Sequence, residues 1–193
     1  MREQARSSFG QLALFARNFL KYPKAVGWML PSTSFVVAQV LNQVDWKKAR
    51  VIVEYGPGIG TFTKEILRRM APEACLVALE INPDFVQLLR ETMPDPRLQL
   101  VQASAADVDI ELARLGHVAA DYIISGLPFK TLPEEVCHRV ALKSHAVLHP
   151  KGAFLVYQLS SVALRYLQPV FSSVRQDCER RSLMPARLFY CRR

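Results

Sequence analysis

The sequence lacks any long hydrophobic run, and this absence limits what kind of protein it encodes. A membrane-spanning helix needs about 20 consecutive apolar residues, and no stretch of the chain approaches that length. The N-terminus also lacks the apolar core and cleavage pattern of a signal peptide, so we expect a cytoplasmic protein. Half of the 193 residues are nevertheless hydrophobic, which is enough for one domain with a sizeable core.

Metal-binding motifs are also missing. The four cysteines are isolated from one another, no CxxC pair occurs, and no histidine stands at metal-ligand spacing. Reduced cysteines with a structural role are the default in a cytoplasmic protein. We therefore expect no zinc site and no metal cofactor.

Positive charge is unevenly distributed, because the net charge of +8 is confined to the two ends of the chain. Residues 1–24 carry five basic residues against Glu3, a net of +4, and residues 174–193 carry six against Asp177 and Glu179, another +4. The residues between these ends therefore sum to zero. Basic ends on a neutral core indicate a polyanionic partner, either nucleic acid or anionic lipid.

The most informative motif begins where the apolar run 51–53 reaches Glu54 and breaks into three alternating glycines, Gly56, Gly58 and Gly60. A helix is predicted to follow over 62–70. A buried strand, a turn without Cβ atoms and a helix N-terminus let backbone amides approach a ligand closely. The dinucleotide fingerprint has a different spacing, Gly-x-Gly-x-x-Gly, so a pyrophosphate has no full cradle here. An ordinary strand-to-helix turn would also accommodate these glycines.

A second acidic residue supports nucleotide binding. The strand predicted over 74–79 ends at Glu80, roughly 20 residues beyond the glycines, where a carboxylate can accept hydrogen bonds from both hydroxyls of a ribose. A third strand, predicted over 98–102, runs into Ser104 and Ala105. Asp107 follows and is a candidate N-cap for the next helix.

The pattern acid-x-Gly-x-Gly-x-Gly resembles motif I of class I S-adenosylmethionine-dependent methyltransferases. The resemblance implies a Rossmann-like α/β fold, a seven-stranded, mostly parallel sheet with helices on both faces and an antiparallel last strand. It implies S-adenosylmethionine as cofactor and S-adenosylhomocysteine as product, with Glu54 near the amino-acid end and Glu80 on the ribose. The expected cofactor-binding residues are Glu54, Gly56, Gly58, Gly60, Thr61, Glu80, Ile81, Ser104, Ala105, Ser125 and Gly126.

An N-terminal segment, residues 1–44, precedes the methyltransferase domain predicted over 45–193. Apolar residues recur at helical spacing from Phe9 to Leu20 with basic residues on the other side, which predicts a basic amphipathic helix ended by Pro23. Such a stripe either packs on the domain or lies in the headgroup region of a membrane.

The stretch from Phe19 to Thr33 narrows the resemblance. It reads Phe-Leu-x-x-Pro-x-x-Val-Gly-x-x-x-Pro-Ser-Thr and is similar to bacterial phospholipid N-methyltransferases. Residues 183–190 also resemble their closing strand, although Ser182 and Met184 depart from its pattern. The resemblance implies methylation of phosphatidylethanolamine, and of its mono- and dimethyl forms, toward phosphatidylcholine. It also implies an enzyme held peripherally on the inner, anionic face of the membrane by the amphipathic helix.

The methyl acceptor is expected where a fourth strand, predicted over 122–125, runs into Gly126-Leu127-Pro128-Phe129. In adenine-N6 methyltransferases the corresponding motif begins with Asn, Asp or Ser, which accepts from the exocyclic amine of a flipped base. Gly126 has no side chain to accept anything, and the chain ends too soon for the helical RNA-binding domain of ribosomal RNA adenine dimethylases. We therefore expect a lipid and not a nucleic acid as partner. An RNA adenine-N6 methyltransferase and a catalytically silent binding module remain the alternatives.

Three residues are candidates for catalysis. Phe129 either contacts the substrate ammonium by cation–π attraction or packs in the core. Tyr157 and Gln158, on a fifth strand predicted over 153–159, are candidates for proton acceptance through water, as are the lipid phosphate and bulk solvent. The candidates for substrate binding are Lys24, Ser32, Leu127 and Arg187.

Overall fold

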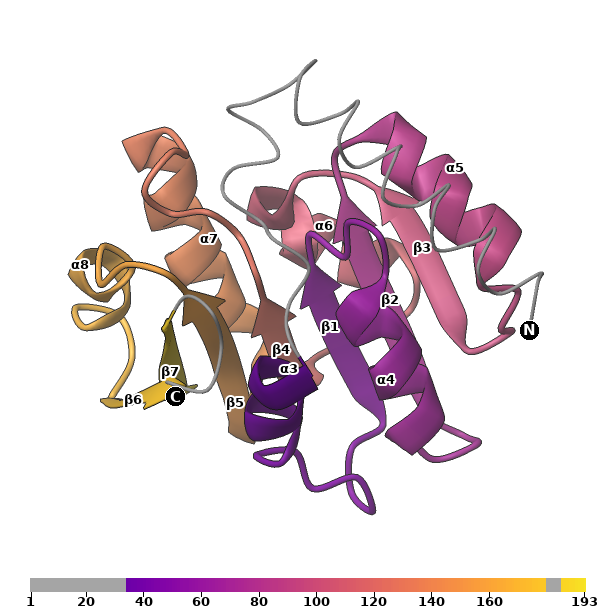
Figure 1. The fold of residues 1–193 in the computed structure, drawn as a ribbon, viewed down its shortest axis with the longest axis horizontal. Helices are drawn as coiled ribbons and strands as arrows, with labels where there is room; N and C mark the ends of the chain where they lie inside the picture. The colour runs from indigo at the N-terminus through magenta and orange to yellow at the C-terminus, as the bar shows by residue number, and fades with distance from the viewer. Residues whose placement is uncertain (1–33, 180–184) are drawn as a thin grey trace.

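The computed structural model describes residues 34–179 and 185–193. The predicted amphipathic helix, Lys24 and Ser32 lie outside these residues. Within them, seven strands form one sheet in the order β3-β2-β1-β4-β5-β7-β6 (Figure 1). The strands are β1 Val51–Tyr55, β2 Cys75–Glu80, β3 Leu98–Gln102, β4 Ala120–Ser125, β5 Leu148–Gln158, β6 Ser173–Glu179 and β7 Ala186–Arg192.

The sheet is parallel except at one strand. β1 pairs in parallel with β2 and β4, while β7 lies antiparallel between β5 and β6. The predicted seven-stranded, mostly parallel sheet with an antiparallel last strand is therefore confirmed. Strand order reverses at β1, because the chain moves outward through β2 and β3 and then returns to β4 on the other side. In open α/β sheets a ligand binds at such a switch point, outside the carboxyl ends of the strands.

Helices cover both faces of the sheet. The helical segments are α3 Ser34–Leu41, α4 Thr61–Arg69, α5 Pro83–Thr92, the 3₁₀ turn η1 Ala105–Asp107, α6 Val108–Arg114, α7 Glu134–Val147 and α8 Leu164–Leu167. Alternate residues of β1 face opposite ways: Val53 packs in a core with α6, α7 and α8, whereas Ile52 packs in a second core with α3 and α4. Both faces are thus buried, which explains the nearly continuous apolar runs of the central strands.

The described end of the N-terminal segment belongs to the domain core. Val40 and Leu41 of α3 are fully buried and share a cluster with Ile66 of α4 and Leu188 of β7. Helix α3 also contacts the last strands through its polar side, where Gln43, just beyond its end, accepts from Arg175 at 2.8 Å. These contacts fix the approach of the chain to β1.

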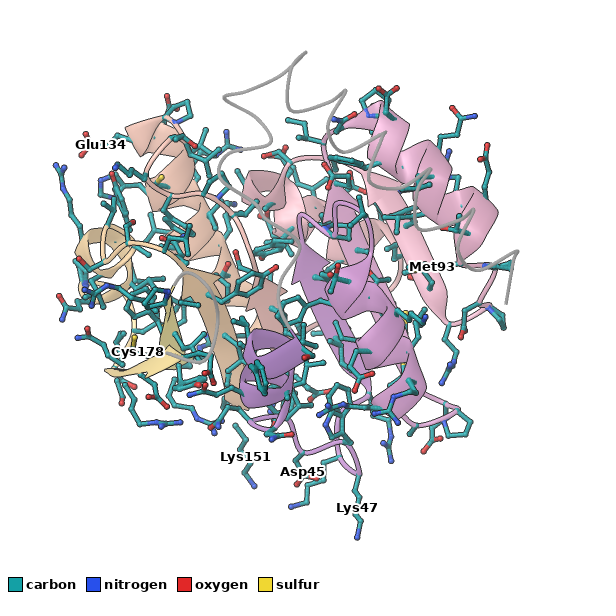
Figure 2. All side chains as sticks on the ribbon, viewed as in Figure 1. Asp45, Lys47, Met93, Glu134, Lys151 and Cys178 are labelled. Carbon is teal, nitrogen blue, oxygen red and sulfur yellow. The ribbon has the colours of Figure 1, made fainter. Side chains whose placement is uncertain are left out.

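The two ends of the parallel strands carry different features. The carboxyl ends of β1, β2 and β4 lie toward the upper side in Figure 1, together with the glycine turn between β1 and α4. Figure 2 shows Asp45, Lys47 and Lys151 at the opposite, lower edge. No helix among residues 34–179 and 185–193 combines the length and apolarity that crossing a bilayer requires.

Candidate active site

The glycine turn adopts the backbone shape that its sequence predicts. Gly56, Gly58 and Gly60 have φ values of 65°, 57° and 84°, in the left-handed region that residues with a Cβ rarely adopt. Gly60 is the N-cap of α4, and its amide bonds to the carbonyl of Pro57 at 2.9 Å. The turn therefore presents bare backbone at the N-terminus of a helix, as an anionic or polar ligand group requires.

Gly60 is also closely packed, and this gives a stability prediction. Gly60→Ala is expected to lower the free energy of unfolding by about 3 kcal/mol, because left-handed strain and overpacking add. A Cβ there would lie 2.7 Å from Cδ2 of fully buried Leu89 and would also meet Met93. Gly116→Ala is the matched control, since Gly116 has φ 81° and nothing within 4 Å of an added Cβ. Chemical denaturation that showed equal losses for both variants would contradict this packing.

Glu80 at the end of β2 is bonded directly to the glycine turn. Its Oε2 accepts from the amide of Gly58 at 3.1 Å, and its Oε1 accepts from the amide of Asn82 at 2.8 Å. Burial raises the pKa of Glu80, although these backbone amides favour the ionised form. An ionised carboxylate offers about four acceptor positions, so the Glu80 carboxylate can accept from a ribose hydroxyl as well as from backbone amides. The two sequence signals, glycines and acid, are thus brought together in space.

Glu54 is a second buried acid at the end of β1. Its side chain is 3% exposed, and Oε2 accepts from the hydroxyl of Thr63 on α4 at 2.8 Å. Burial raises the pKa of Glu54 from 4.5 to about 8, against the opposing effect of the Thr63 bond and with a contribution from the charge of Glu80. A cation bound beside it would favour the ionised form. The site therefore suits a ligand that carries positive charge near Glu54.

The predicted nucleotide-binding residues Ile81 and Ser104 lie at the neighbouring strand ends. Ile81, directly after Glu80, is 66% exposed and offers an apolar surface there. The Ser104 hydroxyl accepts from the amide of Ala106 at 3.2 Å and caps η1. Asp107 makes no side-chain cap at α6, contrary to the alternative considered from sequence, and instead pairs with Arg139 at 2.7 Å. Its carboxylate therefore faces α7 and not the helix amides.

The loop after β4, where the methyl acceptor is predicted to bind and which is called the acceptor loop below, is held by two side chains. Ser125 is fully buried and its hydroxyl accepts from the amide of Leu127 at 3.3 Å. The amide nitrogen of Gln158 donates to the carbonyl of Leu127. Gln158 thus positions this loop, and its part in proton acceptance stays a prediction. Arg187 is exposed on β7, directly opposite Gln158 in the strand register.

Phe129 and Tyr157 have different surroundings. Phe129 is 1% exposed, packs 6.1 Å from the ring of Tyr166, and belongs to the core beneath α7 and α8. This burial fits the core role, and contact with a substrate ammonium stays a prediction. Tyr157 stacks on Phe62 of α4, with ring centroids 4.4 Å apart and an interplanar angle of 15°.

Sequence reasoning missed two of these contacts. Thr63 is absent from the predicted site residues. A hydroxyl in the first turn of the helix that follows the glycines is the local signal that could have indicated its contact with Glu54. The stack of Phe62 on Tyr157 joins residues almost 100 positions apart and has no signal in one sequence. Among the described residues, no group of three or more His, Cys, Asp or Glu side chains could hold a metal ion.

The strand order, the glycine turn and the two acids define a class I methyltransferase, and the site suits S-adenosylmethionine as its cofactor. A family model for ribosomal RNA adenine dimethylase matches residues 31–153, which is more than half of the chain. The chain belongs to this family of S-adenosylmethionine-dependent methyltransferases.

Two curated relatives differ in how much of their length the chain covers. Ornithine lipid N-methyltransferase from Singulisphaera acidiphila is 32% identical over 181 residues, 93% of this chain and 94% of the relative. Ribosomal RNA small subunit methyltransferase A from Mycoplasma mycoides is 27% identical over 122 residues, 58% of this chain. The chain aligns with only 45% of that relative's length.

Solved structures support the fold. Precorrin-6y C5,15-methyltransferase from Geobacter metallireducens has a TM-score of 0.68 at 16% identity, covering 86% of this chain and 91% of the other. Human methyltransferase-like protein 13, crystallised with S-adenosylhomocysteine, has a TM-score of 0.60 at 16% identity, covering 82% and 80%. At such identities the likeness concerns the fold alone.

Proposed function

We propose that this chain transfers methyl groups from S-adenosylmethionine to the amine of a lipid headgroup at an anionic membrane surface. The observation that carries the proposal is Gly126, which is buried at the end of β4 and offers no side chain to an adenine amine. The relative that covers nearly the whole chain, and is covered by it in turn, is named for lipid N-methylation. That agreement supports a lipid amine as the acceptor.

Two headgroups are candidate acceptors. The motif from Phe19 to Thr33 favours phosphatidylethanolamine and its mono- and dimethyl forms, whereas the relative's name favours ornithine lipid. Arg187, exposed beside the acceptor loop, would pair with the headgroup's anionic group, such as the phosphate of phosphatidylethanolamine. When bound, the cofactor supplies a methyl on a sulfonium, which a neutral amine attacks in line. The chain's residues then position the amine and let its proton leave toward water.

RNA adenine methylation is the second candidate function, because the matching family model is that of ribosomal RNA adenine dimethylase. An assay with labelled S-adenosylmethionine separates the candidates. Purified protein is offered anionic vesicles containing phosphatidylethanolamine, anionic vesicles containing ornithine lipid, vesicles with neither, or total RNA. We expect label in at least one aminolipid arm and none in the vesicles lacking an amine. Label found only in RNA would overturn the lipid proposal.

The basic amphipathic stripe between Phe9 and Leu20 is the proposed contact with the membrane, which would place the enzyme peripherally on the inner face. Deleting residues 1–20 is expected to reduce flotation with anionic vesicles about tenfold, because both the apolar stripe and basic charge are lost. Added salt should weaken flotation of the full chain as well. Unchanged flotation after the deletion would mean that the stripe serves only for packing.

A further inference from the structure

Gly126 has no room for a side chain. A Cβ added to it would meet the hydroxyl of Tyr157 and would lie 2.6 Å from Cζ and 3.1 Å from Cε2 of the same ring. Carbon atoms in contact prefer separations of about 3.5–4.0 Å, so the phenol stands in the space that a residue-126 side chain would take. Gly126 does not have a left-handed φ. A larger residue there would therefore be disfavoured by close packing and not by backbone strain.

Neither partner is free to yield. The Tyr157 ring is fixed by its stack on Phe62, which is itself 2% exposed. The loop is fixed at Leu127 by the Ser125 hydroxyl and by the Gln158 amide. The loop therefore cannot shift away without breaking these bonds, and the phenol cannot turn without losing its stack.

This contact lies beside the cofactor turn. The amide of Gly126 reaches toward the carbonyl of Tyr55 at 3.4 Å, and Cδ2 of Leu127 would lie 3.4 Å from a Cβ on Gly56. The methyl acceptor is expected outside the carboxyl end of β4, and the Gly126–Leu127 loop lies directly after that end.

We propose that Tyr157 is a specificity-determining residue, whose phenol fills the position of the absent side chain at Gly126 and narrows the acceptor approach. A slim headgroup amine on a flexible stem fits such an approach, whereas a flat base or a bulkier headgroup needs more width. The inference rests on the proposed lipid function, because it concerns which amine that same site admits. It differs from a role in proton acceptance, which would affect every acceptor alike.

The test compares two amines of different bulk. Wild type, Tyr157→Phe and Tyr157→Ala are assayed as full-length protein on vesicles containing the aminolipid that the wild type labels, either as the primary amine or as its N,N-dimethyl form, whose nitrogen is wider. We expect Tyr157→Ala to shift the ratio of kcat/KM at least about fivefold toward the dimethyl form, with Tyr157→Phe giving a smaller shift of the same sign. Tyr122→Phe is the matched control, because its hydroxyl accepts from the amide of Asp45 at the opposite edge of the sheet. It should leave the ratio unchanged.

A double-mutant cycle tests the contact itself. Gly126→Ala is expected to lower kcat/KM at least about tenfold, and adding Tyr157→Ala should make it no worse than Tyr157→Ala alone, since residues in contact are not additive. S-adenosylhomocysteine affinity and the melting temperature show whether each variant folds. If Tyr157→Ala does not fold, Tyr157→Phe still tests the inference, because it keeps the stacked ring. Losses of kcat/KM that multiply in the double mutant, or equal losses of kcat/KM on both lipid forms, would overturn the inference. A wild type that labels neither phosphatidylethanolamine nor ornithine lipid would overturn the proposed function first, and this inference with it.

Discussion

Glu80→Ala is expected to weaken binding of S-adenosylmethionine about 100-fold, which corresponds to roughly 3 kcal/mol. The change removes the acceptor for the ribose hydroxyls and also releases the amides of Gly58 and Asn82, which Glu80 holds at 3.1 Å and 2.8 Å. Glu80→Gln should cost less, about tenfold, because one carbonyl oxygen remains while the amide NH₂ is left facing a backbone donor. Isothermal titration with S-adenosylhomocysteine measures both.

Glu65→Ala is the control for removing an acid from the same region. Glu65 lies on α4, pairs with Arg68 and Arg69 at 2.7 Å, and takes no part in the site. Its loss should leave cofactor affinity unchanged, because Glu65 does not contact the site. It should also leave the fold intact, because a partly exposed ion pair contributes little to stability. Wild-type affinity in Glu80→Ala, with the fold intact, would show that the cofactor does not lie on β2.

Glu54→Gln is expected to remove a pH dependence of stability that the wild type possesses. Burial raises the pKa of Glu54 from 4.5 to about 8, so between these values the folded state keeps a proton that the unfolded state releases. Stability of the wild type therefore falls as pH rises through this window, by an amount on the order of 4 kcal/mol. Glutamine can still accept the Thr63 hydroxyl at 2.8 Å but does not titrate, so its stability should change much less.

Denaturant unfolding of both proteins from about pH 5 to about pH 9 measures this difference. Glu80 also has a raised pKa, so the informative quantity is wild type minus Glu54→Gln, in which the contribution of Glu80 largely cancels. Saturating S-adenosylmethionine should flatten the wild-type curve, because a cation beside Glu54 favours ionisation. Parallel curves for the two proteins without cofactor would show that Glu54 is ionised at neutral pH.

The sequence predicted β2 and β3 closely. The strand expected over 98–102 was found at those residues, and the one expected over 74–79 was found at Cys75–Glu80, because apolar runs end there at polar residues. β5 begins at Leu148, five residues before its predicted start. Its first part was missed because it contains exposed polar residues such as His149 and Lys151, which interrupt the apolar pattern. β6 is mostly exposed and polar, so only its pairing with β7 defines it.

The cofactor side of the site was more predictable than the acceptor side. Glycine spacing and a strand-end acid are local signals, and the bond between Gly58 and Glu80 joins the two. The acceptor side depends on contacts between distant residues, such as Gln158 with Leu127 and the phenol of Tyr157 against Gly126. For Phe129 the sequence left core packing and substrate contact open, and only its burial beneath α7 and α8 favours the former.

A competition assay tests the central claim most directly. Labelled S-adenosylmethionine and the purified chain are mixed with anionic vesicles containing phosphatidylethanolamine and ornithine lipid, and total RNA is present in the same tube. Lipid and RNA are then separated and counted. Lipid N-methylation predicts label in the amine of an aminolipid and background in RNA. The lipid label should be lost in Glu80→Ala. Label in RNA, with the lipids at background, would contradict it.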